Sequence, residues 1–114
     1  MPRFAVLLHD WPSRHFDFLL EAGDVLRAWR LTSPPRLGAN AAEANADHRK
    51  LYLDYEGEVS GGRGTVARWD AGEFEWVEDA PGRAVVVLRG ALLTGRVELN
   101  YGFTSGANPP GGNG

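Results

Sequence analysis

The sequence predicts a mainly β protein, a small antiparallel β-barrel with one short helix or helical turn. Three observations lead to this prediction. Short apolar or alternating segments recur along the chain, as half-buried strands require. Turn-forming Gly, Pro, Asp and Asn residues separate these segments. The chain has 114 residues, enough for one hydrophobic core and too few for two. A β-sandwich is the alternative arrangement of the same strands.

The composition narrows the class of protein. The 12 Lys and Arg residues against 15 Asp and Glu give a formal charge of -3, which argues against holding nucleic acid mainly through a large positive field. Because cysteine is absent, only imidazole and carboxylate groups remain as metal ligands. The apolar run at residues 4–8 is too short for a signal peptide or a membrane span. We therefore expect a cytoplasmic protein without membrane association.

Three strands are predicted in the N-terminal third. The first ends where a loop containing Pro12 begins, and the loop is short enough for the second strand to return antiparallel beside the first. This pairing brings His9 near His15 and Asp17. A turn at Gly23 then leads into a third alternating segment. The predicted strands are Arg3–His9, His15–Ala22 and Val25–Leu31.

A loop and a helical segment are predicted next. Residues 32–40 contain two consecutive prolines, which favours an extended loop. The alanine-rich residues 41–50 predict a short surface helix or helical turn. If that turn persists, His48 and Tyr52 lie at i and i+4 on one face.

The remaining segments are predicted to be strands. They lie at residues 65–69, 73–77, 84–88 and 92–99, with turns between them. The folded domain is expected to span residues 1–101. Residues 102–114 are mostly Gly, Asn, Pro and Ser, and we expect a disordered tail there.

The second predicted strand separates ligand-type side chains from apolar ones. Period 2 sorts its residues into two faces: His15, Asp17, Leu19 and Glu21 against Phe16, Phe18 and Leu20. With His9, two imidazoles and one carboxylate form a three-ligand set that leaves positions open for water and substrate. Mn²⁺, Fe²⁺ and Zn²⁺ all suit nitrogen and oxygen donors. On the His-x-Asp tripeptide alone, two surface histidines beside a strand-end aspartate are the simpler interpretation.

Two further features suit an anionic ligand. His48 precedes Arg49 and Lys50, and Tyr52 follows one helical turn later, a combination suited to contact with phosphate. A solvated helix end is the alternative. The glycine-rich residues 61–64 could place backbone amides and the Arg63 guanidinium around a phosphate, although most such segments are only turns.

Two spaced motifs resemble those of the 3′-phosphoesterase domain of the bacterial ATP-dependent DNA ligase D of non-homologous end joining, which also occurs as a free-standing protein. The family's opening motif is His-Asp-x4-His-Tyr-Asp-x-Arg-Leu-Glu, and here His9-Asp10 is followed after four residues by His15-Phe16-Asp17-Phe18-Leu19-Leu20-Glu21. The second motif, Asp-His-x3-Tyr and then an acidic residue, an aromatic residue, Glu and Gly, matches Asp47-His48, Tyr52 and Asp54-Tyr55-Glu56-Gly57. Together the motifs use all three histidines.

The resemblance implies a compact β-barrel enzyme that removes a 3′-phosphate or trims a 3′-terminal ribonucleotide from DNA or DNA/RNA 3′ ends. By the match, His9, His15 and Asp17 hold a divalent metal, usually manganese, with zinc, iron or cobalt as alternatives. His48 and Tyr52 match the family's phosphate-contacting pair and are the expected catalytic residues. The expected partners are nucleic-acid 3′ ends and a separate DNA ligase or polymerase, and the expected state is a monomer.

Leu19 departs from the motif. It stands where the family carries an arginine that contacts the phosphate, and leucine can neither neutralise nor hydrogen-bond that group. Loss of one such donor costs roughly 2.7–4 kcal/mol in a transition state, so activity is expected to be weak or redirected unless another cation compensates. We hypothesise that Arg14, Arg49 or Arg63 compensates as a phosphate-binding residue, because each lies beside a matched residue.

Two other functions compete with this interpretation. One is a non-haem iron oxygenase in which His15, Asp17 and His48 form a facial triad, but it leaves His9 unexplained and needs more strands. The other is a non-catalytic module of the same fold that binds DNA ends or a repair protein, which Leu19 and the negative net charge favour. A metal-dependent reaction at a 3′ end separates the second rival from the enzyme.

Overall fold

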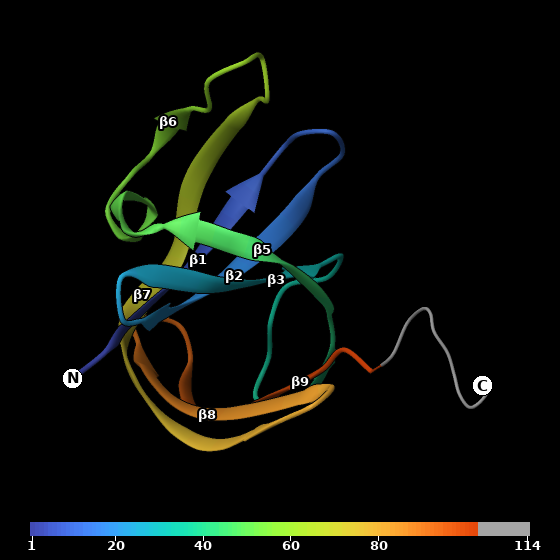
Figure 1. The fold of residues 1–114 in the computed structure, drawn as a ribbon, viewed down its shortest axis with the longest axis vertical. Helices are drawn as coiled ribbons and strands as arrows, with labels where there is room; N and C mark the ends of the chain where they lie inside the picture. The colour runs from blue at the N-terminus through green and yellow to red at the C-terminus, as the bar shows by residue number, and fades with distance from the viewer. Residues whose placement is uncertain (103–114) are drawn as a thin grey trace.

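A computed structural model describes residues 1–102 and has the mainly β fold that the sequence predicts. Within these residues, nine strands and one 3₁₀ turn follow in chain order (Figure 1). They are β1 (Arg3–His9), β2 (His15–Ala22), β3 (Val25–Leu31), β4 (Gly38–Ala41), β5 (Glu43–Arg49), η1 (Lys50–Leu53), β6 (Gly57–Glu58), β7 (Thr65–Ala80), β8 (Arg83–Gly90) and β9 (Thr94–Asn100).

The strands form one sheet in the order β4-β9-β8-β7-β1-β2-β3-β5, with β6 paired to β7. All pairs are antiparallel except β4 with β9. Within residues 1–102 the sheet has β4 and β5 as its two edges, so hydrogen bonding does not close it into the predicted barrel. The long strand β7 runs from the β6 region to the β8–β9 hairpin at the opposite end of the molecule (Figure 1).

Alternation along β1 and β2 builds two cores on opposite faces of these strands. Even-numbered residues such as Phe4 and Phe18 join the larger cluster, which includes side chains of β3, β7, β8 and β9. Odd-numbered residues such as Leu7 and Leu19 join a smaller cluster, covered by η1 and the segment after it through Leu53 and Val59. The predicted division of the second strand into two faces is therefore confirmed.

The prediction of a helix over residues 41–50 is wrong, because residues 43–49 form β5, while Ala41 ends β4 and Lys50 begins η1. The backbone of β5 pairs antiparallel with β3, with Ala44 opposite Trp29 and His48 opposite Leu26. The alanines have high helix propensity, but propensity is a weak preference, and this segment offers no apolar stripe that a helix could bury. Pairing with the open edge of β3 satisfies the backbone groups of both strands. A single 3₁₀ turn, η1, follows the strand and buries Leu53.

Two other boundaries differ from the prediction. Residues 38–41, partly inside the predicted loop, form β4 at the sheet edge. The two strands predicted at residues 65–69 and 73–77 are one continuous strand, and the predicted turn between them is absent. Gly72 is needed there for close approach, since a Cβ would lie 2.9 Å from the Arg89 carbonyl carbon.

Asp70 uses its carboxylate to hold the β8–β9 connection. Its Oδ1 accepts hydrogen bonds from the backbone N–H groups of Ala91 (2.8 Å) and Leu92 (3.0 Å), and its Oδ2 accepts one from Leu93 (2.9 Å). The side chain is 2% exposed, so water cannot replace these bonds. One buried carboxylate therefore fixes the turn between the last two strands.

The tail predicted for residues 102–114 lies outside the described residues, apart from Gly102. In the described part of the chain, no helix has the length and apolar character needed to cross a membrane.

We predict that Asp70→Ala lowers the free energy of unfolding by roughly 2–4 kcal/mol, because three backbone donors lose a buried, charged acceptor. Urea denaturation measures the change. Glu75→Ala is the control, since the Glu75–Arg89 ion pair is about half exposed and such pairs contribute about 0–1 kcal/mol. Equal losses in the two variants would contradict the anchoring role of Asp70.

Candidate functional site

Two histidines and an aspartate converge at one end of the β1–β2 hairpin. His9 ends β1 and lies opposite His15, the first residue of β2, so the hairpin register places the two rings 4.9 Å apart between centroids. His9 Nδ1 lies 3.1 Å from Asp17 Oδ2, and His15 Nε2 lies 3.0 Å from Asp17 Oδ1. One ligand atom from each residue lies within 4.8 Å of the others, so the predicted proximity of the three residues is confirmed.

Backbone carbonyls fix the tautomer of both histidines. His9 Nε2 lies 2.8 Å from the Arg63 carbonyl oxygen, and His15 Nδ1 lies 2.8 Å from that of Ser13. A carbonyl only accepts, so these two nitrogens carry the hydrogens. In the neutral rings, the lone pairs of His9 Nδ1 and His15 Nε2 therefore face the Asp17 carboxylate. Two nitrogen lone pairs and a carboxylate that face one another are suited to hold a cation between them. Metal-binding imidazoles also typically donate their other N–H to a carbonyl oxygen, as both histidines do here.

The cluster of His9, His15 and Asp17 borders a pocket on the side of His9 and Asp17. His15 and Asp17 are buried, whereas His9 is partly exposed. His9 and Asp17 line this open pocket of about 390 Å³, whereas His15 is not one of its lining residues. A ligand in the pocket would therefore approach the cluster from the His9–Asp17 side.

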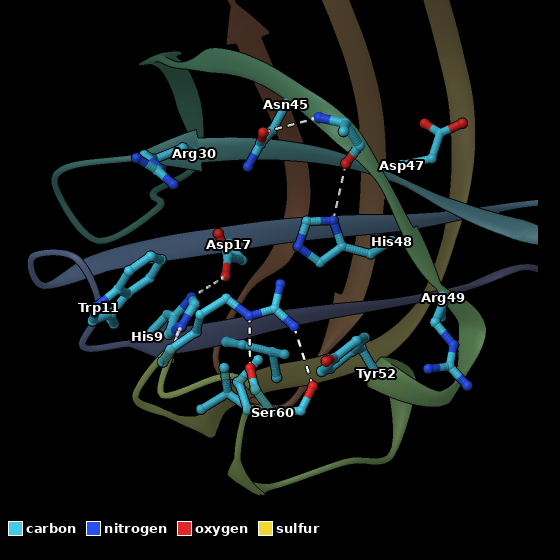
Figure 2. A pocket seen from close by; sticks show the side chains of 15 residues that line it. His9, Trp11, Asp17, Arg30, Asn45, Asp47, His48, Arg49, Tyr52 and Ser60 are labelled. Atoms are coloured by element: carbon cyan, nitrogen blue, oxygen red, sulfur yellow. Dashed lines mark hydrogen bonds and ion pairs between the residues drawn. The ribbon is translucent and has the colours of Figure 1, made fainter.

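His48 and Tyr52 face the same pocket. The His48 Nδ1–H donates to the Ala46 carbonyl (3.0 Å), which leaves Nε2 without its hydrogen in the neutral ring. The rings of His48 and Tyr52 meet edge to face at 5.9 Å between centroids. Figure 2 shows His9, Asp17 and His48 around one cavity, with Tyr52 beside His48. The two residues meet as predicted, but through a strand end and a 3₁₀ turn instead of a helix face.

The three arginines predicted to compensate for Leu19 are placed differently. Arg49 and Arg63 line the pocket, and Arg14 is exposed outside its lining. The Arg63 guanidinium is held by Ser60, with Nε donating to the carbonyl (2.7 Å) and Nη2 to Oγ (3.2 Å).

Sequence reasoning missed Arg30, which lines the pocket from β3. Arg30 lies directly opposite Asp17 in the β2–β3 register. The register could have been counted from the turn at Gly23 and Asp24, because pairing Ala22 with Val25 sets Asp17 against Arg30. The exposed Trp11 is a second missed lining residue, and Figure 2 shows it near His9.

Leu19 lies beneath the site and does not reach solvent. It is fully buried in the smaller core cluster with Leu53, Val59 and Val66. The matched position is therefore part of an apolar floor.

Ion pairs attach η1 to the first two strands and so position Tyr52. Glu21 accepts from the Arg3 backbone N–H (2.9 Å) and pairs with Lys50 (2.6 Å), and Arg3 pairs with Asp54 (2.6 Å). The Lys50 ammonium and then the Arg3 N–H hold the pKa of Glu21 below its ordinary value, and the Arg3 guanidinium lowers the pKa of Asp54. Glu21 and Asp54, both motif residues, therefore have structural contacts.

A second contact holds the loop that carries Trp11. Asp10 Oδ1 accepts from the Thr65 backbone N–H (2.7 Å) and Oδ2 from Thr65 Oγ1 (3.0 Å), and these bonds lower the pKa of Asp10. Gly64 makes the approach possible, since its φ is +75° and a Cβ there would lie 2.6 Å from the Trp11 Cβ and clash with the Asp10 carboxylate. The loop that supplies Arg63's carbonyl to His9 is thus fixed to the β1–β2 loop.

The domain is mainly β and brings two histidines and an aspartate together beside a pocket lined by basic and aromatic residues. These features define a candidate metal centre next to a candidate binding site for an anionic ligand. Residues 8–101 match the family described as the DNA Ligase D 3′-phosphoesterase domain. The chain therefore belongs to this family, which confirms the resemblance indicated by its two motifs.

Two relatives carry the same domain within much longer proteins. The Multifunctional non-homologous end joining protein LigD of Pseudomonas aeruginosa is 32% identical over 108 residues, covering 85% of this chain and 13% of that protein. The Multifunctional non-homologous end joining DNA repair protein LigD of Mycobacterium tuberculosis is 32% identical over 106 residues, covering 84% of this chain and 14% of that protein. The chain thus spans a small part of either relative's length.

We predict that Glu21→Gln removes part of the acid-side pH dependence of stability. Because the folded-state pKa of Glu21 lies below 4.5, its ionised form contributes stability above that pH and loses it as the pH falls through the lowered pKa. Unfolding free energies of wild type and variant should differ most near neutral pH and converge in acid. Glu73→Gln is the control, because this exposed carboxylate makes no side-chain hydrogen bond or ion pair among residues 1–102. A Glu21→Gln offset that is constant with pH would contradict this assignment.

We predict that Gly64→Ala is more destabilising than Gly61→Ala, measured by chemical denaturation. Both glycines have positive φ, so both variants carry backbone strain. Only at Gly64 does the added Cβ also push apart the Asp10–Thr65 contact, whereas at Gly61 it meets only Arg63 Nε at 3.5 Å. Similar losses in the two variants would reject the close-approach role of Gly64.

Proposed function

We propose that this chain is a metal-dependent 3′-phosphoesterase that removes a 3′-phosphate or trims a 3′-ribonucleotide at DNA or DNA/RNA ends. The observation that carries the proposal is the open side of the His9–His15–Asp17 cluster, which faces the pocket lined by His48. Family membership supports the reaction class, since the family is described as a 3′-phosphoesterase domain.

His9 Nδ1, His15 Nε2 and an Asp17 carboxylate oxygen would hold the divalent metal. Their nitrogen and oxygen donors suit manganese, which the family resemblance favours, and also zinc, iron or cobalt. Such an ion, when bound, supplies Lewis-acid polarisation of a phosphoryl oxygen. Asp17 contributes the negative charge of the ligand set, and the carbonyls of Ser13 and Arg63 keep both imidazoles oriented.

His48 and Tyr52 would act on the phosphate from the pocket side. When protonated, His48 keeps its Nδ1–H on the Ala46 carbonyl and offers Nε2–H to a phosphoryl oxygen or to the leaving oxygen. Tyr52 packs against the His48 ring and restricts its orientation. Arg49 and Arg63 add positive charge to the lining of a chain whose net charge is negative.

Nucleic-acid 3′ ends are the proposed substrates, and a separate DNA ligase or polymerase is the proposed partner of a monomeric enzyme. The names of the two relatives support the substrate class, because both describe proteins of non-homologous end joining. The pocket is open to solvent, and this suits a chain end better than a small molecule enclosed on all sides.

A non-catalytic DNA-end or repair-protein binding module is the second candidate. Leu19 favours it, because the matched position is buried and supplies no cation. The iron oxygenase has less support: among residues 1–102, the clustered ligand set contains His9 and not His48.

We predict Mn²⁺-dependent turnover of a 3′-phosphorylated or 3′-ribonucleotide primer-template, measured by gel electrophoresis of the labelled primer. His9→Ala should lower turnover at least about 10- to 100-fold through weakened metal binding, and His48→Ala roughly 10²- to 10⁴-fold through lost acid–base or charge stabilisation. Leu92→Ala, at an exposed side chain outside the pocket lining, should retain wild-type turnover.

Absence of any metal-dependent product from the wild type would reject the enzyme. In that case, retained binding of the 3′ end would support the non-catalytic module.

A further inference from the structure

We infer that Arg30 binds the phosphoryl group of the substrate, a role that nothing in the family motifs assigns to this position. The inference rests on the proposed function and specifies how the site recognises a terminal phosphate. It is carried by the placement of Arg30 in the pocket and by its lack of a partner within residues 1–102.

Arg30 lies on the strand next to the candidate metal centre. It is the cross-strand neighbour of Asp17, and side chains directly opposite one another project from the same face of a sheet, with Cβ atoms about 4.5–5.5 Å apart. Both residues line the pocket. Figure 2 shows Arg30 on the side of the cavity that holds Asp17 and Trp11, away from Arg49.

The Arg30 guanidinium has no ion pair among residues 1–102, and its buried Nε has no hydrogen-bond partner there. Asp17 lies directly opposite but forms no hydrogen bond or ion pair with Arg30, and its two oxygens instead lie 3.1 and 3.0 Å from His9 and His15. Glu43 is next in the same cross-strand row, but it is exposed and forms no ion pair with Arg30. A half-buried guanidinium without a partner is costly to keep, and an anionic ligand would offset that cost.

The other arginines considered for this role are less available. Arg63 is already bonded to Ser60, and Arg14 lies outside the pocket lining. Arg49 lines the pocket at the opposite side from Trp11 (Figure 2). Arg30 thus supplies, from β3, the cation that Leu19 on β2 cannot supply. Its planar fork can bond two oxygens of one phosphate.

Arg30→Gln is the test variant, and Arg27→Gln is its matched control on the same strand. Arg27 lies outside the pocket lining, pairs with Asp79 (2.8 Å) and stacks on Trp29 and Trp76. A purely structural role for Arg30 would make both variants less stable. The inference predicts instead that only Arg27→Gln loses stability, because Arg27 has partners to lose and Arg30 has none among residues 1–102.

Binding is measured by fluorescence anisotropy in EDTA, with one labelled oligonucleotide carrying either a 3′-phosphate or a 3′-hydroxyl. Wild type and Arg27→Gln should bind the 3′-phosphate form more tightly, and Arg30→Gln should lose roughly 10- to 100-fold of that preference, the range expected for one or two charge-assisted hydrogen bonds. Arg30→Lys should recover part of it. In Mn²⁺, kcat/KM for the 3′-phosphorylated substrate should fall in Arg30→Gln and stay at the wild-type value in Arg27→Gln.

An unchanged preference together with unchanged kcat/KM in Arg30→Gln would overturn the inference while leaving the proposed enzyme intact. Conversely, a wild type that prefers the 3′-phosphate without turning it over, with the preference lost in Arg30→Gln, would support Arg30 and reject the enzyme. A wild type without turnover or preference would reject both.

Discussion

The antiparallel pairing of β1 with β2 is the constraint on which the rest of the site depends. It sets His9 against His15 and leaves Asp17 two residues further along, on the same face as His15. Two carbonyls, from Ser13 within the connecting loop and from Arg63 far along the chain, then determine which nitrogens keep their lone pairs. A shift of register by one residue would move Asp17 to the apolar face and Phe16 into the site.

The same strands serve stability and chemistry because their two faces are separate. One face joins the larger apolar core, and the other carries the ligand cluster over a smaller apolar floor that includes Leu19. The motif residues likewise divide into those with structural contacts and those that face the pocket. Glu21 and Asp54 make ion pairs that attach η1, whereas His48 and Tyr52 face the pocket. Occurrence in a motif therefore does not by itself distinguish a structural residue from a functional one.

The features that depend on local spacing could be predicted from the sequence. The two-residue alternation predicted which side chains of β2 share a face, and the short loop after His9 predicted that His9 lies beside His15. Features that depend on distant partners could not. Residues 43–49 form a strand because they pair with the edge of β3. Asp70 and Gly72 do not form the predicted turn: Asp70 holds the distant β8–β9 connection, and Gly72 allows a close approach to Arg89. Arg30 was missed because it adjoins no motif in sequence and reaches the site only across the register. The histidine tautomers depend on a carbonyl 54 residues away from His9, which no local pattern indicates.

Titration of the purified protein with Mn²⁺, followed by electron paramagnetic resonance of the free ion, tests the central claim most directly. The account predicts one bound ion per chain, bound much more weakly by His9→Ala and Asp17→Ala and with unchanged affinity by His48→Ala. This pattern also separates the proposed ligand set from a facial triad of His15, Asp17 and His48. Binding that survives His9→Ala but is lost in His48→Ala would contradict the account, as would a wild type that binds no Mn²⁺.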